Sequence, residues 1–188
     1  MTCADFRVKP TLAGDRVVLR PFTPGDVAAL LEAMADPETA RLTGSRLDPV
    51  ADEEHIRHWY ATRNAQPDRL DLAVVDRAGG RCVGEAVLHE WDEANHSCTF
   101  RILIGPRGRG RGLGTEATRL IVGYGFESLR LHRVSLEVYA FNPRARYVYE
   151  KVGFRAEGVL RDALRTADGW VDATVMSVLS HEWPPAAG

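Results

Sequence analysis

Glycine and arginine alternate in one short stretch of the chain, GPRGRGRGLG from Gly105 to Gly114, directly after an apolar run. Glycines leave backbone amides uncovered, and the interleaved arginines add positive potential around them. An amphipathic segment that predicts a helix follows at once, and the first turn of a helix carries amides without partners. A strand, a glycine loop and a helix N-terminus in this order favour capture of a diphosphate group.

Two common phosphate-binding motifs do not fit this spacing. A P-loop needs lysine and then serine or threonine after its second glycine, whereas arginine and glycine follow Gly110. The dinucleotide fingerprint needs a third glycine at a position that leucine or threonine occupies in this chain. The spacing that does fit is Arg-x-x-Gly-x-Gly, from Arg109 to Gly114.

A second pattern runs from Asn142 to Phe154, with the sequence NPRARYVYEKVGF. An asparagine after an expected strand opens a helix that carries a tyrosine and ends in a glycine–phenylalanine pair. Together and in this order, the two patterns resemble the GNAT superfamily of N-acetyltransferases. The segment from Glu157 to Trp183 is similar to its RimJ/RimL-like branch, which acetylates the N-termini of ribosomal proteins. The resemblance spans residues 14 to 183, nearly the whole chain.

The resemblance implies an acyltransferase that uses acetyl-CoA as cosubstrate, with direct attack of a primary amine on the thioester in a ternary complex. In the family, free amides of the strand before the loop reach the pantetheine arm and the acetyl oxygen, and the loop amides take the pyrophosphate. The asparagine that caps the second helix bonds the pantetheine. Carried over by position, the expected acetyl-CoA-binding residues are Ile102, Leu103, Ile104, Arg109, Gly110, Arg111, Gly112, Leu113, Gly114, Thr115 and Asn142.

The resemblance makes Tyr149 the general acid that protonates the departing thiolate. In the expected helix Ala145, Val148, Tyr149 and Val152 share one apolar stripe, so the tyrosine faces inward. Tyr147 points elsewhere on this helix. The alternative for Tyr149 is an ordinary core aromatic whose hydroxyl finds any acceptor.

The general base is less determined than the acid. Glu85 stands in the middle of an apolar strand, an unusual place for a carboxylate unless it has a partner or faces a cleft. The family often uses a strand carboxylate near this point, which makes Glu85 the expected base. His89, Ser135 and Glu137 are alternatives, as is a reaction that needs no dedicated base. Glu85 in a solvent-facing position of an alternating strand is the structural alternative.

The sequence leaves more than one class of acceptor open. The resemblance of the tail favours the N-terminal amine of a protein or peptide, and a small amine such as an amino acid, a polyamine or an aminoglycoside is the alternative. A catalytically silent acyl-CoA-binding regulatory domain is a further alternative. Segments 36–50, 89–97 and 161–170 are expected to shape the acceptor cleft. No metal is expected, because the helical pair His55 and His58 lacks a third ligand.

Composition sets the remaining expectations. A chain of 188 residues with 45% apolar residues favours a single domain, residues 1–188, with a core over 14–183 and loose termini. The net charge of −2 gives no reason to expect nucleic acid or a membrane surface as a partner. Three cysteines without close spacing favour a reduced, cytoplasmic setting, and no apolar run reaches the roughly 20 residues of a membrane helix. A monomer or a homodimer is expected.

The pattern of apolar residues and turn signals predicts a mixed α/β fold in the order β-α-α-β-β-β-α-β-α-β-β. This is about seven strands in a mostly antiparallel, twisted sheet with about four flanking helices. Strands are expected at 16–22, 70–76, 82–90, 97–104, 133–139, 154–160 and 170–180. Helices are expected from Thr23-Pro24, from Asp48-Pro49 to about residue 64, from 113 to about 129, and from Pro143 to Gly153. The first dozen residues and Pro184–Gly188 are expected to be loose ends.

Overall fold

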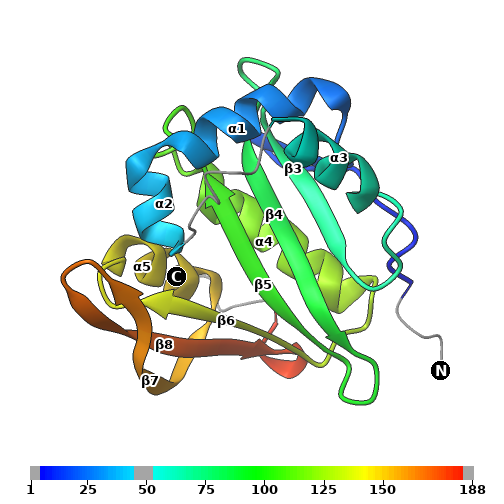
Figure 1. Cartoon of the computed structure of the whole chain (residues 1–188). Coiled ribbons are helices and arrows are strands. Elements are labelled where there is room, and N and C mark those ends of the chain that lie inside the picture. The colour runs from blue at the N-terminus through cyan, green and yellow to red at the C-terminus, as the bar shows by residue number, and fades with distance from the viewer. Residues whose placement is uncertain (1–4, 45–52, 184–188) are drawn as a thin grey trace.

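The computed structural model describes residues 5–44 and 53–183, and the side chains of all of these except Glu53. One sheet of eight strands runs through the molecule in the order β1-β2-β3-β4-β5-β6-β8-β7 (Figure 1). The strands are β1 (Leu12–Ala13), β2 (Val17–Arg20), β3 (Leu70–Asp76), β4 (Arg81–Asp92), β5 (Ser97–Ile104), β6 (Arg133–Tyr139), β7 (Arg155–Thr166) and β8 (Gly169–Leu179). The helices are α1 (Val27–Ala35), α2 (Pro37–Thr43), α3 (Glu53–Arg63), α4 (Leu113–Glu127) and α5 (Pro143–Val152), with 3₁₀ turns at Pro24–Asp26 and Ser180–Glu182.

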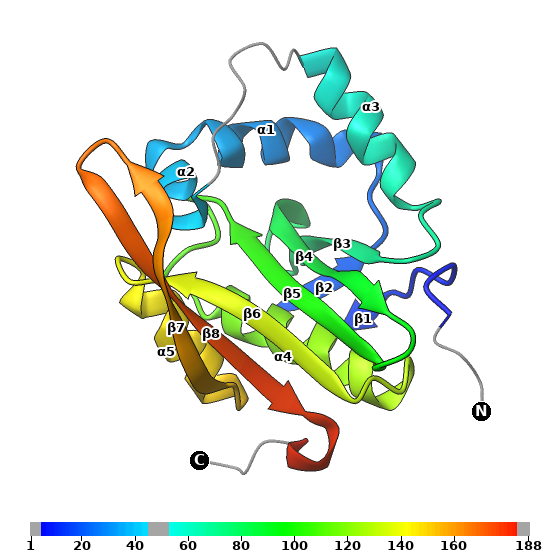
Figure 2. The same cartoon turned by 60° about the horizontal axis from the view of Figure 1, so that its bottom comes forward.

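The mixed α/β fold with a mostly antiparallel sheet is confirmed. All neighbouring strands pair antiparallel except β5 and β6, which run parallel. This parallel pairing is short, because it joins only Ser97–Thr99 to residues 133–135. Beyond Thr99, β5 stays paired with β4 up to Ile104, while β6 pairs with β8, and the two strands run apart (Figure 2). Among the described residues, no strand therefore pairs with the second edge of β5 over residues 100–104.

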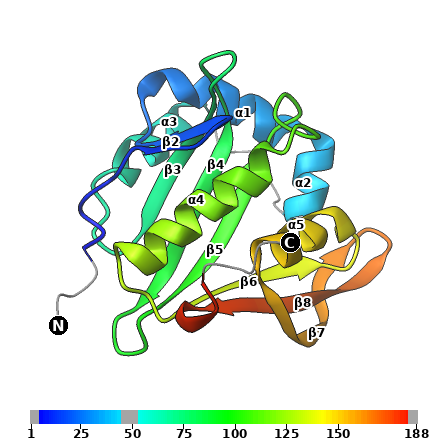
Figure 3. The same cartoon turned by 180° about the vertical axis from the view of Figure 1, so that it is seen from behind.

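Helices cover both faces of the sheet, and the apolar clusters beneath them differ in size. Helices α4 and α5 pack on one face, where Ala117, Ile121 and Val152 join a large apolar cluster with Leu72 and Phe100 (Figure 3). Helices α1 and α3 lie on the other face (Figure 1). There the apolar cluster is smaller and comprises Phe22, Val27, Leu30, Tyr60, Ala73, Val75 and Cys82.

The start and stop interactions that the sequence predicts for α5 are present in the structure. The Asn142 side chain accepts a hydrogen bond from the Ala145 amide at 3.1 Å, and Pro143 is the first helical residue. Gly153 ends the helix with φ 118°, and its amide donates to the Tyr149 carbonyl at 3.1 Å. The cap and the stop fix where this helix begins and ends, and so fix which residues it presents to the sheet.

Two expectations about elements need correction, and two others fall on residues that the structure does not describe. The first dozen residues are not all loose, because Phe6 is buried against Trp91 with ring centroids 5.3 Å apart, and β1 adds an eighth strand. Helix α2 was not expected, although the Asp36 carboxylate accepts from the Thr39 amide and Pro37 follows it. The expected helix start at Asp48-Pro49, like the expected loose end at Pro184–Gly188, lies outside the described residues.

Candidate active site

A cavity of about 600 Å³ lies where β5 and β6 diverge. Its walls come from the free part of β5, the glycine loop, the first turn of α4, helix α5, the end of β6 and helix α2. Of the sequence-predicted residues, Ile102, Leu103, Ile104, Arg109, Gly110, Gly112, Leu113, Gly114, Thr115, Asn142, Glu85 and Tyr149 line it. Arg111 does not line it. The strand divergence thus brings together residues that lie far apart in the sequence.

The glycine loop presents backbone amides to this cavity. Gly112 is the N-cap of α4 with φ 78°, a left-handed conformation that favours glycine, and it has no side chain to cap the helix. The amides of Leu113, Gly114 and Thr115 stand in the first turn, where a helix supplies no acceptor. Uncapped amides at the positive end of a fifteen-residue helix form a site for an anion.

The three loop arginines are all engaged in ion pairs. Each is held by carboxylates of neighbouring elements: Arg107 by Glu32 at 3.0 Å, Arg109 by Glu38 at 2.6 Å and by Asp36, and Arg111 by Asp76 at 2.7 Å. Arg109 also donates to the Thr39 hydroxyl and to the Ile104 carbonyl. The hydrogen bond from Arg109 lowers the pKa of Asp36, and the one from Arg111 lowers the pKa of Asp76. These arginines tether the loop to α1, α2 and the end of β3.

Asn142 joins two elements at the rim of the cavity. Its side-chain oxygen caps α5, and its side-chain nitrogen donates to the Leu42 carbonyl near the end of α2, at 3.4 Å. The Asn142 side chain therefore makes a second hydrogen bond in addition to the helix cap. The residue ties α5 to α2 while it faces the cavity.

Tyr149 projects from α5 into the same cavity. It is 8% exposed, and its ring stands perpendicular to that of Phe100 with centroids 6.2 Å apart. Burial raises the pKa of its hydroxyl to about 12. No protein group among the described residues forms a hydrogen bond with this hydroxyl. The group therefore carries its proton at neutral pH and faces open space.

Glu85 lies on the other face of the sheet and is buried, with 3% of its surface exposed. The solvent-facing alternative is wrong. The Tyr60 hydroxyl donates to Glu85 Oε2 at 3.1 Å, and Arg101 Nη2 lies 2.9 Å from Oε1. Burial raises the pKa of this carboxyl, opposed by the Arg101 charge and the Tyr60 hydrogen bond. The raised pKa suits a base, although both oxygens already have partners.

The other candidate bases differ in position. Glu137 lines the cavity, is exposed, and has no partner among the described residues. Neither His89 nor Ser135 lines the cavity. Burial lowers the pKa of His89, and the Ser135 hydroxyl donates to the Cys98 carbonyl at 3.5 Å.

Several cavity residues were not singled out from the sequence, although Arg41 and Leu42 fall within the segment 36–50 that was expected to shape the acceptor cleft. Arg41 and Leu42 belong to α2, Tyr139 and Phe141 stand at the end of β6, and Arg144 is in the first turn of α5. Of the segments expected to shape an acceptor cleft, 36–50 contributes through residues 38–43, and 45–50 lie outside the described residues. Segments 89–97 and 161–170 contribute no lining residue. The sequence signal that could have located Arg41 is the helix cap at Asp36, because it marks the start of α2.

The described part of the chain holds neither a metal cluster nor a membrane-spanning helix. No group of three or more histidine, cysteine, aspartate or glutamate side chains is placed to hold a metal ion. None of the helices within these residues combines the length and the apolar character needed to cross a bilayer.

Comparison with known proteins decides the family. Residues 16–155 match the model of the acetyltransferase (GNAT) domain. The chain belongs to this family. A spermidine N(1)-acetyltransferase of Escherichia coli (strain K12) is 32% identical over 140 residues, which cover 68% of this chain and 75% of the relative. A second relative is YdaF of Bacillus subtilis (strain 168), whose name marks it provisionally as a ribosomal N-acetyltransferase. It is 34% identical over 104 residues, which cover 55% of this chain and 57% of the relative.

Solved structures of GNAT proteins share the fold. A GCN5-related N-acetyltransferase from Brucella melitensis superimposes with a TM-score of 0.79 at 26% identity, covering 97% of this chain and 85% of that one. A spermidine N-acetyltransferase from Vibrio cholerae, solved in complex with CoA and spermine, gives a TM-score of 0.80 at 23% identity, covering 89% of this chain and 98% of that one. The chain is therefore a GNAT acyltransferase that acts on an amine.

Proposed function

We propose that this GNAT protein transfers the acetyl group of acetyl-CoA to a primary amine, by direct attack of the amine in a ternary complex. The observation that carries the proposal is the opening between β5 and β6, which joins an uncapped helix N-terminus to a buried tyrosine. One cavity thus offers an anion site at one end and a proton donor in the middle. We propose that residues 1–188 act as a single domain, since the strands that line this site belong to one sheet and the helices that line it pack around that sheet.

The residues fit the coenzyme at its phosphate end. The amides from Gly110 to Thr115 supply hydrogen-bond donors for a pyrophosphate, and α4 adds the positive end of its dipole. The unpaired edge of β5 from Phe100 to Ile104 offers main-chain groups to an extended amide-bearing arm, as an open sheet edge does for a peptide. Acetyl-CoA would supply an acyl thioester at the far end of that arm.

Acid and base roles follow from the geometry of the cavity. Tyr149 keeps its proton and faces the open space, so it serves as the donor for the sulfur as negative charge develops there. Glu85 is our proposed base, because it lines the cavity and burial raises its pKa. Glu137 is the alternative base, because it lines the cavity without a partner among the described residues.

The acceptor is a primary amine on a peptide N-terminus or on a small molecule. The relative named for spermidine supports a small acceptor, and YdaF supports a protein acceptor. Turnover should be measured as thiol release from acetyl-CoA with peptides, amino acids and polyamines. Tight CoA binding without thiol release on any acceptor would favour a silent acyl-CoA-binding domain instead. Stabilisation by ATP or NAD but not CoA in a thermal shift assay would overturn the coenzyme assignment.

A further inference from the structure

The charged side chains of the cavity divide into paired and unpaired groups. The charged residues that line it are Glu38, Arg41, Glu85, Arg101, Arg109, Glu137 and Arg144. Arg109 is paired with Glu38, and Arg101 is paired with Glu85. Within the described part of the chain, Arg41, Glu137 and Arg144 have no ion-pair partner. Charges that face a cavity without a partner are the ones available to a ligand.

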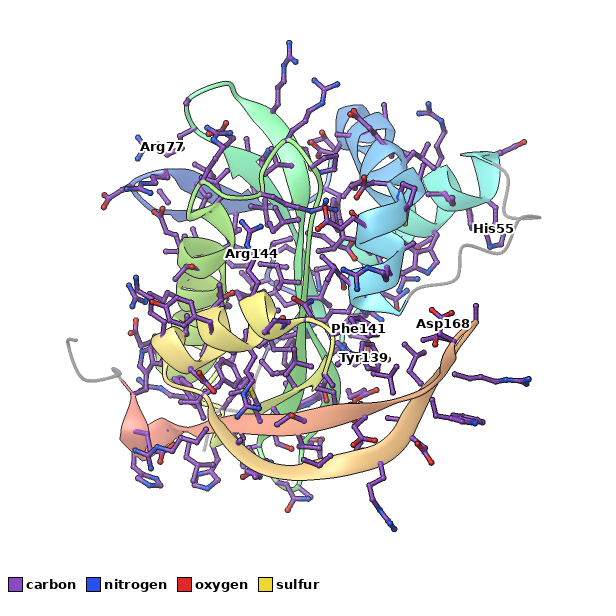
Figure 4. All side chains as sticks on the ribbon, turned by 90° about the vertical axis from the view of Figure 1, so that its left-hand side faces the viewer. His55, Arg77, Tyr139, Phe141, Arg144 and Asp168 are labelled. Atoms are coloured by element: carbon purple, nitrogen blue, oxygen red, sulfur yellow. The ribbon has the colours of Figure 1, made fainter. Side chains whose placement is uncertain are left out.

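Arg144 belongs to the phosphate end of the cavity. Its guanidinium nitrogen Nη2 lies 3.5 Å from the point where a Cβ on Gly110 would be, so it lies over the glycine loop. Figure 4 shows Arg144 on the α4 side of the molecule, away from Tyr139 and Phe141. This arginine is placed for the coenzyme and not for the acceptor.

Glu137 lies on the face of the sheet opposite to α4. Thr99 pairs with Ser135 where β5 and β6 meet, and alternate residues of a strand share a face. Glu137 and Tyr139 therefore lie on the same face as Arg101, which reaches Glu85. The carboxylate of Glu137 borders the side of the opening from which an acceptor would approach.

Arg41 borders the same side from α2. Its guanidinium lies 5.4 Å from the centroid of the Phe141 ring, and the rings of Phe141 and Tyr139 are 5.4 Å apart. Tyr139 and Phe141 lie between α2 and the β7–β8 hairpin in Figure 4. Stacking on Phe141 holds the cation in place without neutralising it. The acceptor side of the cavity thus presents a carboxylate and a guanidinium that have no ion-pair partner among residues 5–44 and 53–183.

We propose that the acceptor carries an anionic group in addition to its amine, with the amine received at Glu137 and the anion at Arg41. This inference rests on the proposed acetyl transfer and specifies its substrate class. Same-face residues of a strand are about 6.6 Å apart, and Arg41 lies beyond Tyr139, so several bonds separate the two groups of the ligand. A free amino carboxylate and a peptide with an acidic residue near its N-terminus share this chemistry. A polyamine would place a second ammonium against an unpaired guanidinium.

Matched pairs of acceptors test the proposal in the full-length protein. γ-Aminobutyrate and putrescine differ mainly in the terminal group, as do ε-aminocaproate and hexamethylenediamine. Peptides beginning Ala-Glu and Ala-Lys with amidated C-termini separate a peptide from a free amino carboxylate. We expect kcat/KM for the anionic member of a pair to exceed that of its cationic partner by tenfold or more.

Substitution of Arg41 links the preference to this residue. Arg41 is exposed, so Arg41→Gln should fold normally, and we expect it to abolish the preference through the acceptor KM. Arg41→Lys should retain a part of the preference. Arg144→Gln is the matched control, an unpaired cavity arginine at the other end, which should raise the KM for acetyl-CoA without changing the choice between acceptors.

The outcomes separate failure of this inference from failure of the proposed function. Efficient turnover of the diamines over their anionic partners would overturn the anionic acceptor, as would an Arg41→Gln variant with unchanged selectivity. CoA binding without turnover on any member of the panel would instead contradict acetyl transfer. In that case the thermal shift of the CoA complex with ε-aminocaproate against hexamethylenediamine still tests the site, and equal shifts would overturn it.

Discussion

The two ends of the cavity are built from different parts of the chain. At the glycine loop, the arginines are held by carboxylates of α1, α2 and β3, and backbone amides are what remains for a ligand. On the proposed acceptor side, side chains of α2, β4, β5 and β6 face the opening. The first end thus offers backbone groups, which substitutions of neighbouring side chains leave in place. The second end can change its specificity by single substitutions without disturbing the fold.

Tyr149 stands between the two ends, and its loss should have the largest effect. Tyr149→Phe removes the proton donor and keeps the ring against Phe100. We expect kcat to fall by about 10²-fold with little change in the KM for acetyl-CoA. Because burial raises the pKa of Tyr149 to about 12, this group should cause no alkaline loss of kcat below about pH 11. An unchanged kcat, measured by thiol release, would remove the acid role.

The backbone character of the phosphate end is tested at Gly114. This glycine has no left-handed conformation, and a Cβ there would only touch Ile104 at 3.5 Å. Gly114→Glu places a carboxylate beside the uncapped amides, where it suits the helix dipole and repels a diphosphate. We expect CoA affinity to fall by about tenfold or more with no loss of melting temperature.

Gly114→Gln is the control for this experiment, because it adds the same bulk without the charge. Its CoA affinity should lie between those of the wild type and Gly114→Glu, as measured by calorimetry. Equal losses for both variants would assign the effect to bulk and not to the phosphates. Gly112 is a poorer choice, because its φ of 78° makes any side chain there strained.

The role of the loop arginines is tested at Arg109. If Arg109 acts as a tether, Arg109→Gln should weaken CoA binding by about fivefold, on the order of 1 kcal/mol. The double variant Asp36→Asn, Glu38→Gln removes the partners and keeps a side chain that caps α2, and it should weaken CoA binding similarly. A direct phosphate contact predicts the opposite, since freeing Arg109 from its carboxylates would then raise CoA affinity.

The contrast between the ends also explains what the sequence could predict. Spacing of glycines, caps and apolar residues located the loop, the start of α5 and four strands closely, because these signals are local. Arg109 and Arg111 were expected among the coenzyme-binding residues, but their ion pairs with Asp36 and Asp76 could not be predicted, because these partners come from distant segments. Arg41 and Glu137 face the same cavity only because β5 and β6 diverge, which no local pattern shows.

Glu85 gives the smallest predicted effect and distinguishes a buried base from a structural ion pair. Burial raises the folded-state pKa of Glu85 above its ordinary value of 4.5, so its ionised form costs folding free energy. The contribution of Glu85 to the free energy of unfolding is therefore fully present below pH 4.5. It is lost as the pH rises through the folded-state pKa. Glu85→Gln retains an acceptor for Tyr60 and removes this loss.

We therefore expect Glu85→Gln to gain stability relative to the wild type between pH 5 and pH 8, by on the order of 1 kcal/mol for each unit of raised pKa. Denaturant unfolding at both pH values measures the slope. Glu137→Gln is the matched control, the same substitution at an exposed cavity carboxylate that has no partner among the described residues. The opposite result is a wild type that becomes more stable relative to Glu85→Gln as the pH rises. That result would show that the Arg101 charge affects the pKa of Glu85 more than burial does. Glu85 would then be a permanently ionised structural group, and Glu137 would be left as the carboxylate able to accept the proton of the amine.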